Sequence, residues 1–542
     1  MGTLVLEKEF IKEENYKKIT FFINIFAILS AVSYMLCVHE RYESSTLNEN
    51  LTKIILSIVI IVALSIILFK FKRNFILDTL KMGFKNINYI AFSILSTFAL
   101  LTFIAETDSL QLIEKLIFGI LSSFIIFIFF LKSYLYLVPK IINFFKTLSR
   151  NEKKYLLYAS IFYTILLLIT TLNTRMFLGI SLSGRWYEVF SFDTASTYAY
   201  ETLVNPYNYN NNIRHLLMSY VTLPFTAFPF VLFKSFHAVF IFYFFYIVAQ
   251  EIMVISIIIL LKRLIKIENS FIELSFYLLA TVSSTFIINF LVNEKFVISI
   301  LFLVLAISAT INQNDSKFYY FFMSLASLTS NILLFIPIFF YKTNIKKGIK
   351  NTIIFGLLFL LACIVAGQAE HLVYVLSEMN SLNRFTGDEV LFSTRLIMFF
   401  VFMTKLFFIP NSCIKRYDIW ETEPTVNSFY FWIGIIIFVI TILGFILNRK
   451  NSFMKICFYW FIIMIVYSVL IGWGTGTNEL FLNSIMYFWA IIPLIFIFIV
   501  KIAKKPKIIL GICIMLGTIT LAMNGIQFYD LMVKSHSIYP MF

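Results

Sequence analysis

The sequence predicts an all-α polytopic membrane protein, and three observations lead to this prediction. Hydrophobic residues make up 60% of the 542 residues and charged residues only 13%, which leaves too little polar surface to cover a soluble domain. Apolar runs of about 17–25 residues recur along nearly the whole chain, and each is long enough to cross a hydrocarbon core of about 30 Å as a helix. The alternation of apolar and polar residues that a β-barrel needs is absent.

Basic residues between the apolar runs predict which helix ends are cytoplasmic. Lys and Arg cluster at 70–85 and again at 140–154, after two further crossings, and loops rich in these residues stay in the cytoplasm. A fifth run at about 155–172 therefore crosses outward, so that the segment after it is expected on the extracytoplasmic face. The four runs before it are expected as full spans at about 19–38, 54–69, 88–105 and 112–131.

Three later apolar segments fit either a full span or a partial one. The first contains two prolines, polar residues split the second into half-length pieces, and the third contains two basic residues and ends at a proline. If they were full spans, the basic clusters at 262–266 and 342–350 would lie outside, so the charge pattern favours interfacial or half-span structures. These segments are 216–233, 318–341 and 393–410.

The remaining runs alternate regularly across the membrane. With them the chain has roughly a dozen full transmembrane helices plus partial and interfacial ones. Two long outer loops result, 173–215 and 370–428, and the C-terminus also lies outside. We divide the chain into an N-terminal four-helix transmembrane region, 1–150, and a transmembrane module that carries the outer loops, 151–542. The remaining runs lie at about 352–369, 429–448, 454–471, 480–500 and 508–525.

The charge and the metal-binding residue types exclude two classes of partner. The net charge of +15 comes from basic residues between apolar runs, which orient a membrane protein, so nucleic acid is not an expected partner. The five Cys form no Cys-x-x-Cys pair, and no two of the five His have the spacing of metal ligands. Neither a zinc site nor a His-built metal site is therefore expected.

The first outer loop contains the strongest candidate for catalysis, Asp193, in the stretch "FSFDTASTYAYETLVNPYNYNNNIRH". Tyr198, Glu201, Arg214 and His215 follow it. A carboxylate beside a membrane-embedded cavity can deprotonate an acceptor hydroxyl, and a nearby cation can stabilise a departing phosphate. The alternative is that Asp193 caps a short helix over about 194–204.

Five basic side chains are candidates for binding a lipid phosphate, and one of them, Arg384, lies in the second outer loop. Arg214 and His215 stand directly before an interfacial apolar stretch, and Arg395 and Lys405 lie in another. Snorkelling to the headgroups explains the same positions without a ligand. The glycines of "GWGTGTNEL", 472–480, follow a transmembrane helix and not a strand, which predicts a flexible outer turn rather than a nucleotide site.

In the order of these features the chain resembles the GT-C superfamily of membrane glycosyltransferases. A span precedes a long outer loop with an Asp ("FSFDTASTY"), and a polar-to-basic segment follows ("NNNIRHLLMSYVTLPF"). An acidic turn before a span ("NEKFVISILFLVLA"), the stretch "SLASLTSNILLFIP" and a late outer turn into a span ("NELFLNSIMYFWAIIPLI") come later. These matches cover about 155–525 and leave the first four spans outside the resemblance.

The resemblance implies transfer of a sugar from a polyprenyl-phosphate donor to an acceptor on the extracytoplasmic face. Asp193 would be the catalytic base, and Arg214 with His215 would lie near the donor phosphate; Tyr198, Glu201, Arg395 and Lys405 complete the expected substrate-binding set. No second Asp forms an Asp-x-Asp pair with Asp193, so a divalent metal stays open but has no support from the sequence, and no other cofactor is indicated. The expected partners are the lipid-linked donor and membrane lipids, and the expected location is a bacterial plasma membrane, in the synthesis of cell-envelope polysaccharide.

Two other classes remain open. A polysaccharide polymerase of the O-antigen type would use Arg and His in the second outer loop, here His371, Arg384 and Arg395. A lipid-linked oligosaccharide flippase or another transporter would need ionisable residues deep within its spans. The predicted spans contain few such residues, which favours the transferase.

Overall fold

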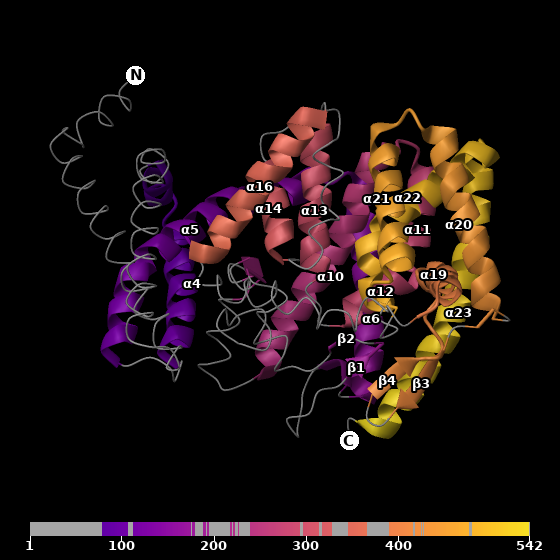
Figure 1. Ribbon diagram of the computed structural model, residues 1–542, viewed down its shortest axis with the longest axis horizontal. Helices are drawn as coiled ribbons and strands as arrows, with labels where there is room; N and C mark the ends of the chain where they lie inside the picture. The colour runs from indigo at the N-terminus through magenta and orange to yellow at the C-terminus, as the bar shows by residue number, and fades with distance from the viewer. Residues whose placement is uncertain are drawn as a thin grey trace. The chain divides into compact units, whose positions relative to one another are not determined.

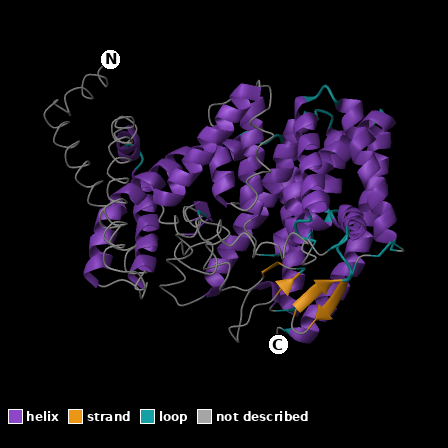
Figure 2. Ribbon diagram, in the orientation of Figure 1, coloured by secondary structure: helices purple, strands orange, loops and turns teal. Residues whose placement is uncertain are grey.

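The computed structural model describes most of the chain from residue 78 onward. α-Helices dominate this part, with four short strands (Figure 2). The described ranges are 78–106, 112–174, 176–178, 188–190, 192–193, 217–218, 221–222, 226, 239–292, 296–313, 317–327, 345–365, 390–415, 418–423, 425–426, 428–475 and 480–540.

The chain forms two compact units. The first comprises Met1–Thr147, Thr222–Ala238 and Ile364–Gln368, and the second comprises Leu148–Val221, Val239–Cys363 and Ala369–Phe542.

In the first unit, helix α4 (Ile87–Glu106) packs against helix α5 (Leu112–Lys146). A hydrogen bond of 2.7 Å between the Ser96 and Tyr134 hydroxyls joins them. Both helices were expected from apolar runs, but α5 continues beyond the run that predicts it. The two earlier runs, 19–38 and 54–69, lie outside the described residues.

The second unit is a bundle of long helices with shorter ones among them (Figure 1). Polar side chains define several helix starts: Ser149 and Glu152 form a reciprocal capping box, and Asn269, Ser428 and Asn451 accept backbone N–H bonds. The helices are α6 (Arg150–Asn173), α10 (Val239–Ile265), α11 (Ser270–Thr281), α12 (Ser284–Leu291), α13 (Phe296–Ile311), α14 (Lys317–Ser327), α16 (Ile345–Val365), α19 (Phe392–Lys405), α20 (Phe429–Asn448), α21 (Ser452–Ile465) with a π-helical end (Val466–Ile471), α22 (Ser484–Ala503) and α23 (Pro506–Ile538).

Six described helices are long and apolar enough to cross a membrane, which agrees with an all-α membrane protein. The pair α11 and α12, bent by 57° at the break between them, would make a seventh span. The expected dozen stays a prediction, because several of the expected runs lie outside the described residues. The six are Arg150–Asn173, Phe244–Ile265, Phe429–Asn448, Ser452–Ile471, Phe481–Ala503 and Pro506–Ile538.

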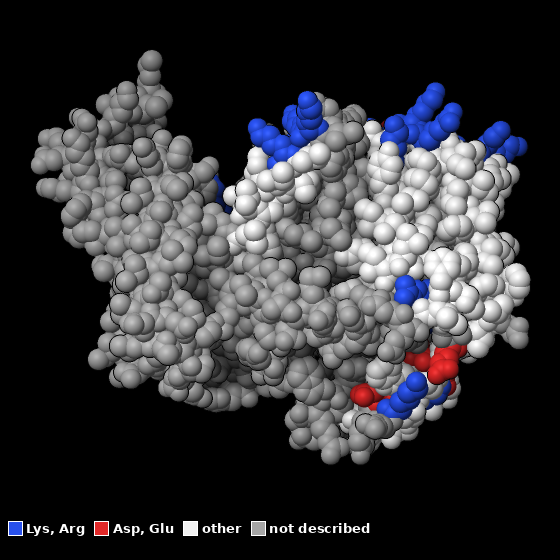
Figure 3. All heavy atoms as spheres, viewed as in Figure 1, with Lys and Arg blue, Asp and Glu red and all other residues white. Residues whose placement is uncertain are grey.

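Charged side chains divide the second unit into two ends. Figure 3 shows most of the Lys and Arg side chains in view at one end, and the acidic side chains in view at the other, where a few Lys or Arg accompany them. The basic end contains the start of α16, with Lys346, Lys347 and Lys350, and the connections from α20 to α21 and from α22 to α23. We call it the basic end, and we call the opposite end the sheet end, because the strands lie there. This separation is what the positive-inside rule requires of a membrane protein.

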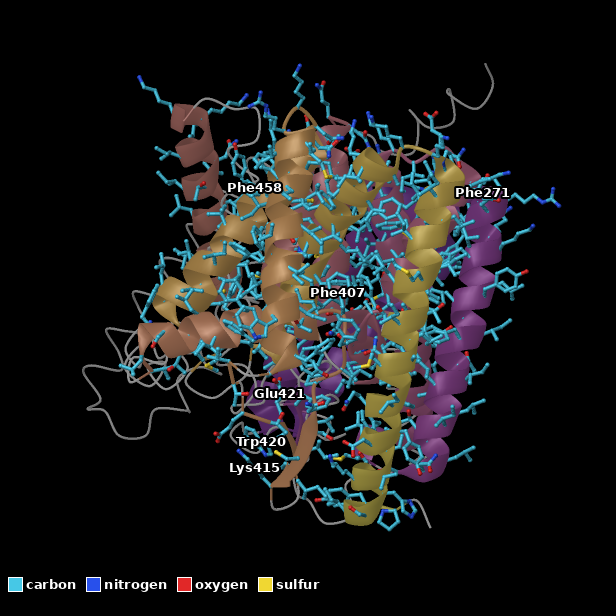
Figure 4. All side chains as sticks on the ribbon, turned by 90° about the vertical axis from the view of Figure 1, so that its right-hand side faces the viewer. Phe271, Phe407, Lys415, Trp420, Glu421 and Phe458 are labelled. Atoms are coloured by element: carbon cyan, nitrogen blue, oxygen red, sulfur yellow. The ribbon has the colours of Figure 1, made fainter. Side chains whose placement is uncertain are left out.

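Helix α19 lies crosswise to the long helices: it is seen end-on in Figure 1 and from the side in Figure 4. It occupies most of 393–410, the segment expected to be interfacial or re-entrant. A Cβ on Gly434 of α20 would overlap the Phe400 carbonyl of α19, so the two backbones touch where the helices cross. The other two uncertain segments lie largely outside the described residues, although α14 covers the first part of 318–341.

Candidate functional site

A four-stranded sheet brings the two outer loops together. Its strand order is β2-β1-β4-β3. Strands β1 (Glu188–Val189) and β2 (Phe192–Asp193) belong to loop 173–215, and β3 (Ser412–Lys415) and β4 (Asp418–Glu421) belong to loop 370–428. The loops pair directly, since β1 runs parallel to β4 with Val189 opposite Ile419. Residues that are far apart in the sequence thus form one surface at the end of the bundle (Figure 2).

Phe190 anchors the strand that carries Asp193. Its side chain is fully buried, with its ring edge-on to Phe481 at a centroid distance of 5.8 Å. Its N–H donates to the Ile419 carbonyl at 2.8 Å. Its φ of 53° is unfavourable for a bulky residue, and such strain persists only where surrounding contacts fix the backbone. The β1–β2 hairpin is therefore held firmly against both β4 and the short 3-10 helix Phe481–Asn483 that precedes α22.

The register divides the acidic residues of the sheet into two rows along the backbone. Asp193 pairs with Glu188, and since Val189 pairs with Ile419, Glu188 lies beside Asp418. Asp193, Glu188 and Asp418 thus share one row across three strands. The neighbouring row of β4 contains Ile419, which is fully buried, and Glu421 alternates with Asp418 onto that buried face. The helix-cap interpretation of Asp193 depends on residues 194–204, which lie outside the described residues.

Glu421 forms a buried ion pair with Lys405 at the end of α19. Only 3% of the Glu421 side chain and 8% of the Lys405 side chain are exposed, and the Lys405 Nζ contacts Glu421 Oε2. Glu421 Oε1 is buried and has no hydrogen-bond partner among the described residues. Burial raises the pKa of the Glu421 carboxyl, and the Lys405 ammonium opposes that rise. In Figure 4, Glu421 lies nearer the helical bundle than Trp420 and Lys415 do.

Hydrogen bonds fix the chain around Lys405. The hydroxyl of Ser284 donates to the Lys405 carbonyl, and that of Thr285 donates to the Leu406 carbonyl at 2.9 Å. The Asn524 amide of α23 donates to the Phe407 carbonyl at 2.9 Å. Carbonyls that α19 leaves unpaired at its end are thus satisfied by the first residues of α12 and by α23. Lys405 is consequently held at a junction of three helices.

The other predicted site residues differ in how the structure describes them. Arg395 is half-buried, and its guanidinium donates to the Val390 carbonyl at 3.0 Å and to the Leu470 carbonyl at 3.1 Å. It therefore links α19 to the π-helical end of α21, beside the turn in which Gly472 and Gly474 have positive φ. Phosphate binding by Arg395 and Lys405 stays a prediction. The remaining four residues lie outside the described residues: Tyr198, Glu201, Arg214 and His215.

Glu251 was not among the predicted site residues. It is buried in the middle of α10, in hydrogen-bond reach of the Ser160 and Thr164 hydroxyls of α6. It precedes Arg263 by three helical turns or more, which places it about 18 Å along the helix from the basic end. The signal was available in the sequence as one acidic residue inside an apolar run.

A charged cluster at the basic end has a structural role. Arg263 of α10 donates two hydrogen bonds to Glu152 of α6, at 2.8 and 2.7 Å, and Lys262 contacts Glu273 of α11 at 2.6 Å. These bonds join three helices. Among the side chains that the structure describes, no three His, Cys, Asp or Glu are placed to hold a metal ion.

No protein-family model matches the chain, and neither a curated protein nor a solved structure does. The site itself therefore carries the functional argument.

Proposed function

We propose that the protein is a GT-C-like membrane glycosyltransferase that moves a sugar from a polyprenyl-phosphate donor to an acceptor on the extracytoplasmic face. One observation carries the proposal: the two outer loops pair in a single sheet at the end opposite the basic end. That sheet holds the backbone of Asp193 in place and adjoins the crosswise helix α19, which bears Arg395 and Lys405.

Each part of this arrangement suits such a transfer. The polyprenyl chain would lie among lipids along the spans, and its phosphate would lie at the depth of α19, where headgroup phosphates lie. The acceptor would arrive from outside, over the sheet. A carboxylate would then accept the proton of the acceptor hydroxyl while a cation stabilises the departing phosphate.

The finer features belong to the same proposal. They are roughly twelve spans, a four-helix region over 1–150 in addition to the catalytic module over 151–542, and location in a bacterial plasma membrane. The use of Tyr198, Glu201, Arg214 and His215 in binding the donor is part of it as well.

Substituting Asp193 tests the proposal. Asp193→Asn keeps the shape and the strand but cannot accept a proton, so turnover should fall by roughly 10²–10⁴-fold. The measurement is sugar transfer by purified protein from a set of polyprenyl-phosphate sugars, at equal folded amounts. Asp530→Asn is the matched control, because Asp530 lies at the same end on α23, in a partly exposed pair with Lys534.

Two results count against the proposal. If wild-type protein transfers sugar and the Asp193→Asn variant transfers it with the same turnover, the base is another residue. If wild-type protein transfers nothing from any donor, the O-antigen-type polymerase becomes the better hypothesis, with Arg395 as the described member of its predicted set.

A transporter is the second candidate, and Glu251 favours it. A carboxyl buried in the middle of a spanning helix is rare and often marks a pathway for ions or protons. In proteoliposomes, a transporter should move a lipid-linked oligosaccharide or an ion, and Glu251→Gln should abolish that movement. Equal transport by wild type and the Gln variant would mean that Glu251 serves only to bond α10 to α6.

A further inference from the structure

The Lys405–Glu421 pair is incompletely satisfied, which is unusual for a buried ion pair. Lys405 bonds one carboxylate oxygen, while Oε1 of Glu421 is buried and bonds to none of the residues that the structure describes. A buried acceptor without a donor is unfavourable, and a buried ion pair is retained mainly where its remaining bonds are made. The missing bond points to a proton or a ligand that this carboxylate receives in another state.

The charges nearby leave Glu421 dependent on Lys405. Ser412 lies opposite Glu421 in the sheet, and Lys534 and Asp530 of α23 meet at Ser412, where they neutralise each other at 2.5 Å. The phenol of Tyr430 donates to the Ile409 carbonyl, and the thiol of Cys413 points to the Glu421 carbonyl. Among the described residues, Lys405 is therefore the cation that holds the charge of Glu421.

We propose that Lys405 exchanges its partner: it leaves Glu421 to pair with the terminal phosphate of a polyprenyl phosphate, and Glu421 takes up one proton on Oε1. The inference rests on the proposed function, since it concerns the phosphate that the transfer releases. The charges balance. Before the exchange the Lys405–Glu421 pair is neutral, the phosphate is a dianion and one proton is free; afterwards Glu421 is a neutral carboxyl, and the Lys405 ammonium is paired with the phosphate dianion. Without that proton, a buried carboxylate would lose its counter-ion, which is strongly unfavourable.

The position of Lys405 suits a lipid phosphate better than a free one. Helix α19 lies crosswise at the sheet end of the bundle, and Leu391 and Phe392 at its start are exposed and apolar. A crosswise helix of this kind lies at the level of lipid headgroups.

Binding of polyprenyl phosphate in nanodiscs tests the exchange between pH 7 and 9, above the second phosphate pKa of about 6. Uptake of one proton predicts that wild-type affinity rises by about tenfold for each unit that the pH falls. Glu421→Gln frees Lys405, so it should bind about tenfold or more tightly than wild type at pH 9, with no pH dependence. Lys405→Met should lose about tenfold or more.

If the Lys405–Glu421 pair only clamps α19 to the sheet, the expected effect of Glu421→Gln on phosphate binding is the opposite. Both Glu421→Gln and Lys405→Met would then weaken binding, and the wild type would show no proton uptake; either result overturns the inference. The double variant Asp530→Asn with Lys534→Gln controls for loss of an ion pair at the same end without leaving Lys534 as a second cation, and it should bind as wild type does. If the Gln variant does not fold, proton uptake by wild type, measured calorimetrically in two buffers, decides the matter.

The outcomes separate this inference from the proposed function. If wild type transfers sugar but its binding of polyprenyl phosphate does not depend on pH, the partner exchange of Lys405 is overturned and the proposed function is not. Absence of both transfer and polyprenyl-phosphate binding overturns the function, and the exchange with it. Inorganic phosphate is the second ligand in the test, and equal affinity for it would overturn the assignment to a lipid.

Discussion

Replacing Phe190 should release the hairpin that carries Asp193. The ring is fully buried and packs edge-on against Phe481, and truncating a buried Phe to Ala costs about 3–5 kcal/mol. Because the hairpin has only two residues in each strand, this cost should appear as local opening rather than global unfolding. The opening equilibrium of 188–193 should then rise by roughly 10²–10⁴-fold.

Hydrogen–deuterium exchange measures this opening directly. The informative amide is that of Phe190, which donates to Ile419 across the sheet. Phe190→Gly adds a second comparison, because Gly adopts a φ of 53° without strain. The Gly variant should open no more than the Ala variant, although it lacks one more carbon. Phe429→Ala removes the same ring at the sheet end of α20, where it is 57% exposed, and should leave exchange at 188–193 unchanged.

Unchanged protection of the Phe190 amide in the Ala variant would refute this reasoning. It would mean that the backbone pairing with β4 suffices and that the buried ring does not position the hairpin.

Three further predictions concern the bundle. Gly434→Ala should disrupt the crossing of α19 over α20 and lower the thermal stability in detergent. Gly511→Ala should have little effect, because no described atom lies within 4 Å of the new methyl group. Equal melting temperatures of the two variants would contradict the close approach of α19 and α20. A single Cys at Lys346 in a Cys-free variant should react with an impermeant thiol reagent only after the membrane is opened, and labelling in intact cells would contradict the assignment of the basic end to the cytoplasm. Glu152→Gln should cost about 3 kcal/mol because it removes the carboxylate that accepts two hydrogen bonds from Arg263, while Lys262 keeps its ion pair with Glu273. The double variant with Arg263→Met should cost less than the two single effects combined, as thermal unfolding will show.

The sequence predicted the long helices well because each is an apolar run bounded by polar residues. The crosswise helix α19 was also anticipated, since Arg395, Lys405 and Pro410 make 393–410 a poor span. In both cases the deciding signal lies within the segment itself.

The sheet and the ion pair were not predictable in this way. Strands of two to four residues show no periodicity, and nothing in the first outer loop indicates that it pairs with the second. Glu421 lies in a polar loop where a charged residue is ordinary, and only the fold reveals that it is buried beneath Lys405. The residue type of Asp193 makes it a candidate base, and its pairing with Glu188 adds its place in the sheet.

The pairing of the outer loops has a consequence for how the protein is made. Strand β1 cannot pair until β4 has been synthesised. The Thr174 hydroxyl at the end of α6 likewise donates to the Tyr539 carbonyl at 2.9 Å, across 365 positions of the chain. During synthesis the first loop therefore spends a long time without its partners, since a contact of such sequence separation forms late. Ribosome-bound chains halted before α19 should expose the Asp193 segment to protease, and the sheet should assemble only after the later helices have inserted.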